Sequence, residues 1–327
     1  LKGTTTSITI RKGGPPILDL PISMHSDENI NLHADGSIAM EAANITGSEG
    51  TLNRQAKSAA RSAFESTKQR FFGHLLTSMK TPTLIRSIEA DLEAGHAAVI
   101  QIVSTGEALM ERRLSEIPTE EWSDISVDVT PREYVGSYLQ HSFPVQLYEP
   151  FTDGEGNLSS RPVFRDGQPV ESREAVARRD EMLEQLGSLP AVPGALDQIV
   201  QRFGTDMVAE VTGRSRRIVR KGDGASARLA VENRAPSANL AETSAFMDDQ
   251  KRILVFSDAG GTGRSYHAEL SAKNQRLRVH YLLEPGWKAD AAIQGLGRTN
   301  RTNQAQPPLF RPIATDVKAE KRFLSTI

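Results

Sequence analysis

Apolar runs alternate with amphipathic stretches along most of the chain, and this alternation predicts strands and helices in turn. From Arg54 to Met79 apolar residues recur near one face, which is typical of a helix or a helix pair. A further helix is expected to end at Gly95, and a β-rich run from Ala97 to Val103 follows it. Two more helical stretches are predicted at about 171–187 and 194–203.

Five apolar runs separated by helical or turn segments are candidates for parallel strands. Their residues are 97–103, 207–213, 253–257, 278–284 and 309–315. Buried parallel strands read as continuous apolar runs, so this rhythm predicts an α/β fold, with a doubly wound parallel sheet and helices on both faces. Ligands of such sheets bind beyond the carboxyl ends of the strands, where the loops after Val103, Thr212 and Ser257 are expected to lie.

Two regions depart from this rhythm. Residues 117–175 are rich in proline and contain the Asp-Gly pairs Asp153-Gly154 and Asp166-Gly167, which predicts an insertion with a small hairpin. Residues 1–52 are rich in Gly, Thr, Ser and Asn, and we interpret them as a segment connecting to a missing upstream domain.

The composition of the 327 residues narrows the class of protein. With 38% apolar residues and no long apolar run, we expect a soluble globular protein in the cytoplasm, without membrane contact. The absence of cysteine excludes thiolate metal sites, and no metal is predicted. Because the chain starts at Leu1 and stops at RFLSTI, we expect a fragment of a longer protein in which 317–327 begin a downstream segment.

The stretch SDAGGTGRS, residues 257–265, follows a strand in the manner of a phosphate-binding loop. A P-loop, however, reads G-x-x-x-x-G-K-[ST], whereas here Asp258 replaces the first glycine and Arg264 replaces the lysine. These substitutions disfavour a nucleotide cradle, because an acidic side chain would stand beside the phosphates. A degenerate P-loop and a plain strand-to-helix turn both remain alternatives.

A second constellation lies in AAIQGLGRTNRTNQ, residues 291–304. Gln294, Arg298 and Arg301 are spaced by four and three residues, so on a helix or its terminal turn they share one face. No acidic residue lies between Ala291 and Gln304, which suits an external anion such as a transferring phosphoryl group. A solvated basic helix face is the alternative.

One dense basic cluster stands out in a chain with a net charge of −2. It comprises Arg214, Arg216, Arg217, Arg220 and Lys221, after a predicted strand end. Such a cluster favours contacts to a nucleic-acid backbone that do not depend on base sequence, although a basic solvent loop is an equal alternative on charge alone. Gln101, Ser104 and Thr105 end the first strand and are predicted to hydrogen-bond phosphates alongside.

These motifs resemble those of superfamily-two helicases. Q-x-x-G-R-x-x-R-x-x-Q resembles motif VI, and SDAGGTGRSYHA resembles motif V. The stretches TPTLIRSIEADLEAGHAAVIQIVSTGEA and FGTDMVAEVTGRSRRIV, together with residues 273–304, are similar to the carboxy-terminal helicase domain of the strawberry notch family, over about residues 55–316. The bacterial, plasmid or phage type is expected. The resemblance implies the second RecA-like domain, here 53–316 with the insertion.

The resemblance also implies residue roles. Catalytic positions would be Arg298 and Arg301, reaching ATP phosphates bound on the first RecA-like domain, with Gln294 orienting nearby; Asn300 stands where many relatives have His. The motif V loop, with Asp258, would couple nucleotide to nucleic acid. Cofactor-binding positions would be Gly261, Gly263 and Asp290, the last near the ribose. Nucleic-acid-binding positions would be Gln101, Ser104, Thr105, Thr212, Arg214, Arg217, Thr262 and Ser265.

The expected function is that of one half of an ATP-dependent helicase or translocase. ATP and Mg²⁺ would be held mainly by the first RecA-like domain of the same polypeptide, because no G-x-x-x-x-G-K-[ST] and no acidic Mg²⁺ box occurs here. The fragment alone is therefore expected to be inactive as an ATP hydrolase. The expected partner is nucleic acid, DNA rather than RNA. The alternatives are a noncatalytic nucleic-acid-binding or protein-interaction domain, and a degenerate P-loop NTPase using 257–265.

Overall fold

The computed structural model describes two compact units. The described residues are 54–125, 132–188, 192–222, 224–261, 263–286, 288–315, 317, 320–321 and 324–325, so the predicted connecting segment 1–52 lies outside them. Within these ranges, unit 1 comprises 54–72 and 132–188, and unit 2 comprises the remainder. Helix α2 (Arg54–Glu93) contributes residues to both units.

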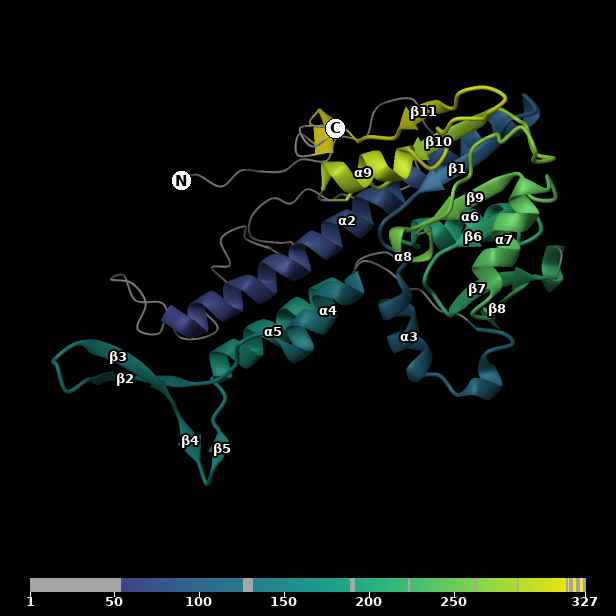
Figure 1. Ribbon diagram of the computed structural model, residues 1–327. Coiled ribbons are helices and arrows are strands. Elements are labelled where there is room, and N and C mark those ends of the chain that lie inside the picture. The colour runs from purple at the N-terminus through teal and green to yellow at the C-terminus, as the bar shows by residue number, and fades with distance from the viewer. Residues whose placement is uncertain are drawn as a thin grey trace. The chain divides into compact units, whose positions relative to one another are not determined.

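Unit 2 is built on a parallel sheet of five strands (Figure 1). The strands are β1 (Ala97–Gln101), β6 (Val208–Val211), β9 (Ile253–Phe256), β10 (Arg278–Leu282) and β11 (Leu309–Pro312). Their order is β11-β10-β1-β9-β6, and every neighbouring pair is parallel. Each of the five predicted apolar runs contains one of these strands, so the predicted parallel sheet is confirmed.

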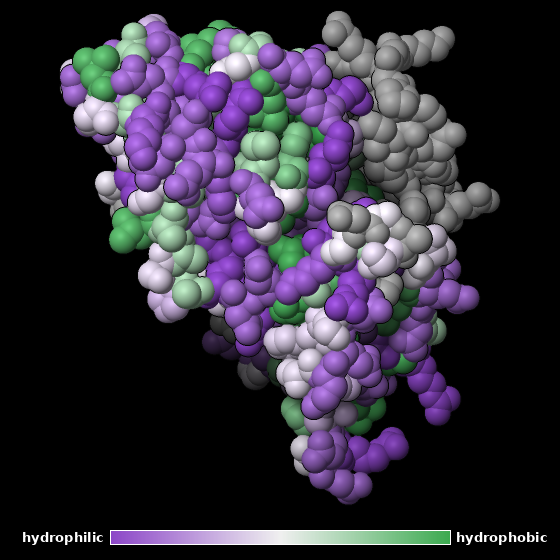
Figure 2. Space-filling view, turned by 90° about the vertical axis from the view of Figure 1, so that its right-hand side faces the viewer, coloured by the Kyte–Doolittle hydropathy of each residue, from purple (hydrophilic) through white to green (hydrophobic). Residues whose placement is uncertain are grey.

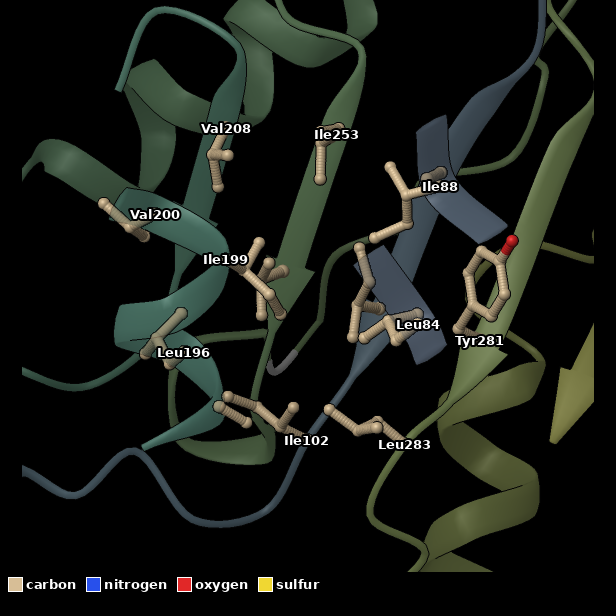
Figure 3. Close-up of a cluster of buried hydrophobic side chains, with 14 of the residues drawn as sticks. Leu84, Ile88, Ile102, Leu196, Ile199, Val200, Val208, Ile253, Tyr281 and Leu283 are labelled. Carbon is tan, nitrogen blue, oxygen red and sulfur yellow. The ribbon is translucent and has the colours of Figure 1, made fainter. Parts of the chain in front are cut away.

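Helices cover both faces of this sheet. Successive residues of a strand point to opposite faces, so alternate residues of one strand pack against different helices. Ala98 and Ile100 of β1 join a core with α2 and α6 (Ala195–Phe203), whereas Ala97 and Val99 pack with Phe246 of α7 (Ala238–Met247). Figure 3 shows the first of these cores, in which Leu84, Ile88, Leu196, Ile199 and Val200 come from the two helices. The α/β doubly wound arrangement is confirmed and agrees with a RecA-like helicase domain.

A β-hairpin contains most of the basic cluster, for which the sequence alone left a solvent loop as an alternative. β7 (Arg216–Lys221) pairs antiparallel with β8 (Arg228–Asn233). Ile218 and Val219 in its middle are buried, and Val219 belongs to the core beside α6. Their burial explains why this stretch forms a strand despite its charge.

The helix predicted within 291–304 is shorter than expected. α9 spans Ala289–Leu296. The amide of Gly297 still donates to the carbonyl four residues earlier, whereas those of Arg298 and Thr299 donate to the carbonyls three residues earlier. The two glycines at 295 and 297 weaken the helix, so the chain leaves it in a tight turn. Arg298 and Arg301 therefore lie beyond α9 and do not continue a helix face from Gln294.

Short helical segments also belong to the described part of unit 2. They are α3 (Glu107–Ser115), the 3₁₀ turn η1 (Thr119–Glu121) and α8 (Asp258–Gly261), to which η2 (Gly224–Ser226) adds one turn between the strands of the β7–β8 hairpin. α8 directly follows β9 and contains the first half of the glycine loop.

Unit 1 packs the amino-terminal part of α2 with α4 (Arg132–His141) and α5 (Arg173–Gly187). Two hairpins extend the chain between these helices: β2 (Tyr148–Thr152) with β3 (Leu158–Pro162), and β4 (Phe164–Arg165) with β5 (Gln168–Pro169). The second turns at Asp166 and Gly167, whose φ angles are 52° and 74°, as a two-residue Asp-Gly turn requires. The sequence predicted the hairpin character of this region but not α4. The predicted domain boundaries remain predictions.

The surface is mainly polar in the view of Figure 2, where hydrophobic residues form small, separate patches. No helix in the described residues combines the length and apolar character that a membrane span requires.

Candidate functional site

The loop after β9 packs tightly on the end of β6. Gly260 is buried, and a Cβ atom there would collide with the backbone of Val211 and Thr212. Only glycine allows this close approach of two loops at the carboxyl edge. Gly263 has a different reason to be glycine, since its φ is 73° and nothing lies within 4 Å of its Cβ position. Gly261 belongs to the same loop, and Thr262 lies outside the described residues.

Gln101, at the carboxyl end of β1, supports helix α9. Its Nε2 donates to the carbonyl of Ala292 at 3.3 Å, and its side chain occupies the space that a Cβ of Gly295 would need. The residue is only 4% exposed. Gln101 was predicted to contact phosphates, but its side chain is covered by α9, so it positions that helix instead.

The turn after α9 is tied to the glycine loop through Arg298. Its Nη1 donates to the carbonyl of Arg264 at 3.0 Å, and its guanidinium lies 5.7 Å from the ring centre of Phe256. The carbonyl of Arg298 in turn accepts from the amide of Tyr266 at 2.7 Å. The two motifs that the sequence singled out are thus joined in space through main-chain and side-chain hydrogen bonds.

Arg301 differs from Arg298 in being exposed. Its backbone amide donates to the side chain of Gln304 at 3.2 Å, and Gln304 also donates to Asn300 at 3.0 Å. Within the described ranges, no hydrogen bond or ion pair engages the Arg301 guanidinium, so it faces solvent from a braced turn. The side chains of Gln294 and Asp290 are also exposed, on α9.

A buried histidine anchors the same turn to the sheet. His280 of β10 lies 2.7 Å from the hydroxyl of Thr299 through Nδ1, and that hydroxyl donates to the carbonyl of Leu296. Because the hydroxyl proton is used there, Nδ1 of His280 carries the hydrogen and donates it to Thr299. Burial lowers the pKa of His280 to about 3, so the ring is neutral at pH 7.

Glu284, just beyond β10, holds the loop that follows β1. Its carboxylate accepts from the amides of Val103 and Ser104 at 2.9 and 2.7 Å, and from the Ser104 hydroxyl at 2.9 Å. Thr105 accepts from the amide of Glu107 at 3.4 Å at the start of α3. The polar residues predicted after β1 therefore have hydrogen-bond partners within the chain. Ser265 is half-buried next to Tyr266.

A charge cluster surrounds Glu210 in the middle of β6. Its carboxylate, which is fully buried, accepts from Arg214 at 2.6 and 3.0 Å and lies 3.4 Å from Arg234 and 3.6 Å from Arg217. Burial by itself would raise the pKa of Glu210, but the charge and hydrogen bonds of Arg214, with Arg234, lower it to about 2. The carboxyl is therefore ionised at pH 7.

This cluster corrects the interpretation of part of the basic segment. The Arg214 side chain is 1% exposed and also pairs with Asp197 at 2.7 Å, and Arg217 pairs with Glu232 at 2.6 Å. Thr212, predicted as a nucleic-acid contact, is buried and donates to Glu210 at 2.7 Å. In this arrangement these three side chains stabilise the fold and are not accessible to an external phosphate.

Several residues of the site were missed at the sequence level. Glu210 could have been recognised as a buried charge, because it is a charged residue within an apolar run. Gly295 could have been recognised as a close-contact position, because it is a glycine within a predicted helix. Glu284, His280 and Arg234 carry no local signal, because their partners are distant in sequence. The described residues contain no cluster of His, Asp or Glu that could hold a metal ion.

The comparisons with known proteins place this geometry in context. Residues 194–327 match the family model of the C-terminal domain on strawberry notch homologues. The chain is 29% identical over 334 residues to protein strawberry notch homolog 1 of Rattus norvegicus, which covers 81% of this chain and 26% of that protein. No solved structure matches it significantly.

Two further relatives match a shorter part of the chain at higher identity. Protein strawberry notch of Drosophila melanogaster is 38% identical over 162 residues, and protein FORGETTER 1 of Arabidopsis thaliana 37% over 158. Each alignment covers 47% of this chain, and 10% and 12% of the relative. The chain thus spans at most about a quarter of the length of these curated relatives. All three are eukaryotic, so they do not support the expected bacterial, plasmid or phage type.

Proposed function

We propose that the chain is the carboxy-terminal RecA-like half of an ATP-dependent helicase or translocase that acts on nucleic acid, DNA rather than RNA. Another RecA-like domain of the same polypeptide would supply the phosphate loop and the Mg²⁺ ligands. The exposed guanidinium of Arg301, without an internal partner in the described chain, is the observation on which the proposal rests. The match of residues 194–327 to the strawberry notch domain supports it.

The two arginines of the turn have different tasks in this proposal. Arg298 joins the turn to the glycine loop through the Arg264 carbonyl, so it is a positioning residue. Arg301 projects outward and contacts the phosphates of a nucleotide held by the other domain, where its positive charge stabilises the charge that develops during phosphoryl transfer. The His280 to Thr299 hydrogen bond holds the turn at the sheet and so keeps the direction of Arg301 constant.

The glycine loop of this chain does not fit a complete ATP cradle. A cradle needs backbone amides that face the phosphates, but Gly260 is buried against Thr212, and its amide bonds to the Ser257 carbonyl at 3.2 Å. Asp258 is exposed beside the loop and would repel the nucleotide phosphates. The loop fits a coupling element better, because it touches both the end of β6 and the turn that carries Arg301. Hydrolysis of the bound ATP would supply the free energy, and Mg²⁺ would offset the negative charge of its phosphates.

The test is the nucleic-acid-stimulated ATPase activity of the full-length protein that contains this chain. An arginine finger contributes about 10³-fold or more to kcat, so Arg301→Ala is expected to lower kcat by about that factor, with a much smaller change in KM. Arg301→Lys should recover only part of the loss, because lysine lacks the planar fork. The 327-residue chain alone is expected to hydrolyse no ATP above background.

Arg86→Ala provides the matched control. Arg86 is an exposed arginine of α2 that hydrogen-bonds only its helix neighbour Thr83 in the described residues, and its loss should leave kcat unchanged. Unaltered ATPase activity in Arg301→Ala would reject the finger assignment and favour a noncatalytic binding domain. Robust ATPase activity of the isolated chain that is lost in Arg264→Ala would favour a self-contained degenerate P-loop.

A further inference from the structure

The β7–β8 hairpin divides the basic segment into two chemically different parts. Near its base, Arg216 pairs with Glu111 and stacks on the ring of Trp122 at 5.1 Å, and Arg217 pairs with Glu232. Arg220 and Lys221, at the far end of β7, are exposed and have no hydrogen-bond or ion-pair partner in the described part of the chain. The cations at the base are thus neutralised internally, whereas those at the tip are not.

The strand register adds a third cation to the tip. Lys221 pairs with Arg228 of β8, which is also exposed and unpaired within the described ranges. Side chains directly opposite each other on one face of an antiparallel pair have Cβ atoms about 4.5–5.5 Å apart. Two positive charges therefore face each other at the end of the hairpin, and the sequence alone does not show that they are close.

This like-charge pair has no evident value for the fold. Arg217, four residues before Lys221 on the same face of β7, lies opposite Glu232 in the same register and pairs with it. At that position the hairpin therefore places opposite charges across the strands, which stabilises it. Like charges directly opposite destabilise a sheet, and a strand ending in Lys221 could have been matched by almost any other residue. A pair that costs stability while facing solvent is the arrangement expected for an external anion.

The chemistry of the tip favours a nucleic-acid backbone over a protein partner. From Arg220 to Arg228 the chain carries three cations and one anion, Asp223, and no exposed aromatic or aliphatic anchor of the kind that protein interfaces need. Gly222 and Gly224, which follow β7, have φ angles of 82° and 56°, a conformation that favours glycine. With a net charge of −2, the chain as a whole does not attract polyanions, and the contact must be local.

We propose that the hairpin tip, formed by Arg220, Lys221 and Arg228, binds the phosphate backbone of the nucleic acid on which the motor acts. The inference rests on the proposed function for the identity of the ligand. It assigns to these three residues the phosphate contacts that the sequence predicted for Arg214 and Arg217. Backbone contacts of this kind carry no base specificity and depend strongly on salt.

The test is Lys221→Glu, because it moves binding and stability in opposite directions. The new glutamate faces Arg228 as an opposite charge, so the thermal midpoint of the 327-residue chain should be unchanged or higher. Each phosphate contact is worth about eightfold in affinity between 1 M and 0.1 M salt. Binding of a fluorescent DNA duplex at 0.1 M salt should therefore weaken about tenfold, and the slope of log K against log salt should fall by about 1.

Two controls isolate the site. Lys273→Glu makes the same charge change at an exposed lysine outside the hairpin and should leave both affinity and salt slope near wild type, and Lys221→Arg should retain binding. Equal DNA affinity in Lys221→Glu and wild type would overturn the inference. Unchanged DNA affinity combined with lost binding of poly-glutamate would also overturn it, because the tip would then bind an acidic protein partner. Absence of salt-dependent DNA binding by wild type would refute the nucleic-acid part of the proposed function itself.

Discussion

Substitution of Glu210 by glutamine tests the charge cluster that supports the edge of the sheet. The change keeps the size of the side chain and most of its hydrogen-bonding atoms, but it removes the negative charge that faces Arg214, Arg217 and Arg234. Because the carboxylate is fully buried, no water can compensate the guanidinium groups that remain.

Two arguments give the same magnitude for the loss. A carboxyl whose pKa falls from 4.5 to about 2 on folding stabilises the folded state by about 3 kcal/mol at pH 7. Removing one partner from a buried ion pair costs about 3–5 kcal/mol, since the other charge stays buried. Glu210→Gln is therefore expected to lower the free energy of unfolding of unit 2 by about 3 kcal/mol at pH 7.

The assay is urea denaturation followed by tryptophan fluorescence, which reports on unit 2 because Trp122 and Trp287 both fall within its segments. The pH dependence is the sharper readout. The folded pKa of Glu210 is depressed, so its contribution is complete above pH 4.5 and is lost as the pH falls through about 2. The difference between wild type and Glu210→Gln should shrink accordingly between pH 4.5 and 2.

Glu232→Gln is the matched control, because Glu232 pairs with Arg217 at the partly exposed end of the same cluster. Its loss should cost under about 1 kcal/mol, as is usual for exposed pairs. A difference between wild type and Glu210→Gln that stays constant from pH 7 to pH 2 would show that the charge of Glu210 does not stabilise the fold, and the reasoning would fail.

Two further pairs of substitutions probe the glycine contacts and the anchoring of the turn after α9. Gly260→Ala is expected to destabilise unit 2 by about 2–3 kcal/mol in the same urea assay, because the new methyl group collides with backbone atoms. Gly295→Ala should cost less, because its methyl group meets the movable end of the Gln101 side chain. Equal losses of stability in the two variants would contradict this reasoning. Thr299→Val should cost about 1–3 kcal/mol by leaving the buried Nδ1 hydrogen of His280 unpaired, and Thr299→Ser should restore most of it. A valine variant as stable as wild type would exclude the hydrogen bond as an anchor.

Much of the fold could be predicted because parallel strands covered on both faces are predominantly apolar. The run 253–257 and the four like it needed no knowledge of their partners to be recognised as strands. The β7–β8 hairpin escaped prediction because its basic residues concealed the two buried positions, Ile218 and Val219. The early end of α9 was missed because helical spacing was extended through Gly297, where the backbone leaves the helix.

The site was predictable in its composition but not in its pairing. The motif pattern identified Arg298 and Arg301 together, yet only the fold shows one arginine bonded to the Arg264 carbonyl and the other exposed. Charge density likewise identified the basic segment without distinguishing its members. Whether a given arginine is free depends on carboxylates such as Asp197 and Glu232, and their positions follow from sheet order and register.

The glycine contacts of the carboxyl edge have a consequence for how such chains diverge over evolution. Gly260 is required by the collision of a side chain with the backbone of Thr212, whatever chemistry the domain performs. Arg301 makes no internal bond through its side chain in the described residues, so the fold places no demand on its identity. Under the proposed function, a descendant that abandons ATP hydrolysis would be free to lose the arginine, while purifying selection for foldability would still retain the glycine, so the two positions would record different histories.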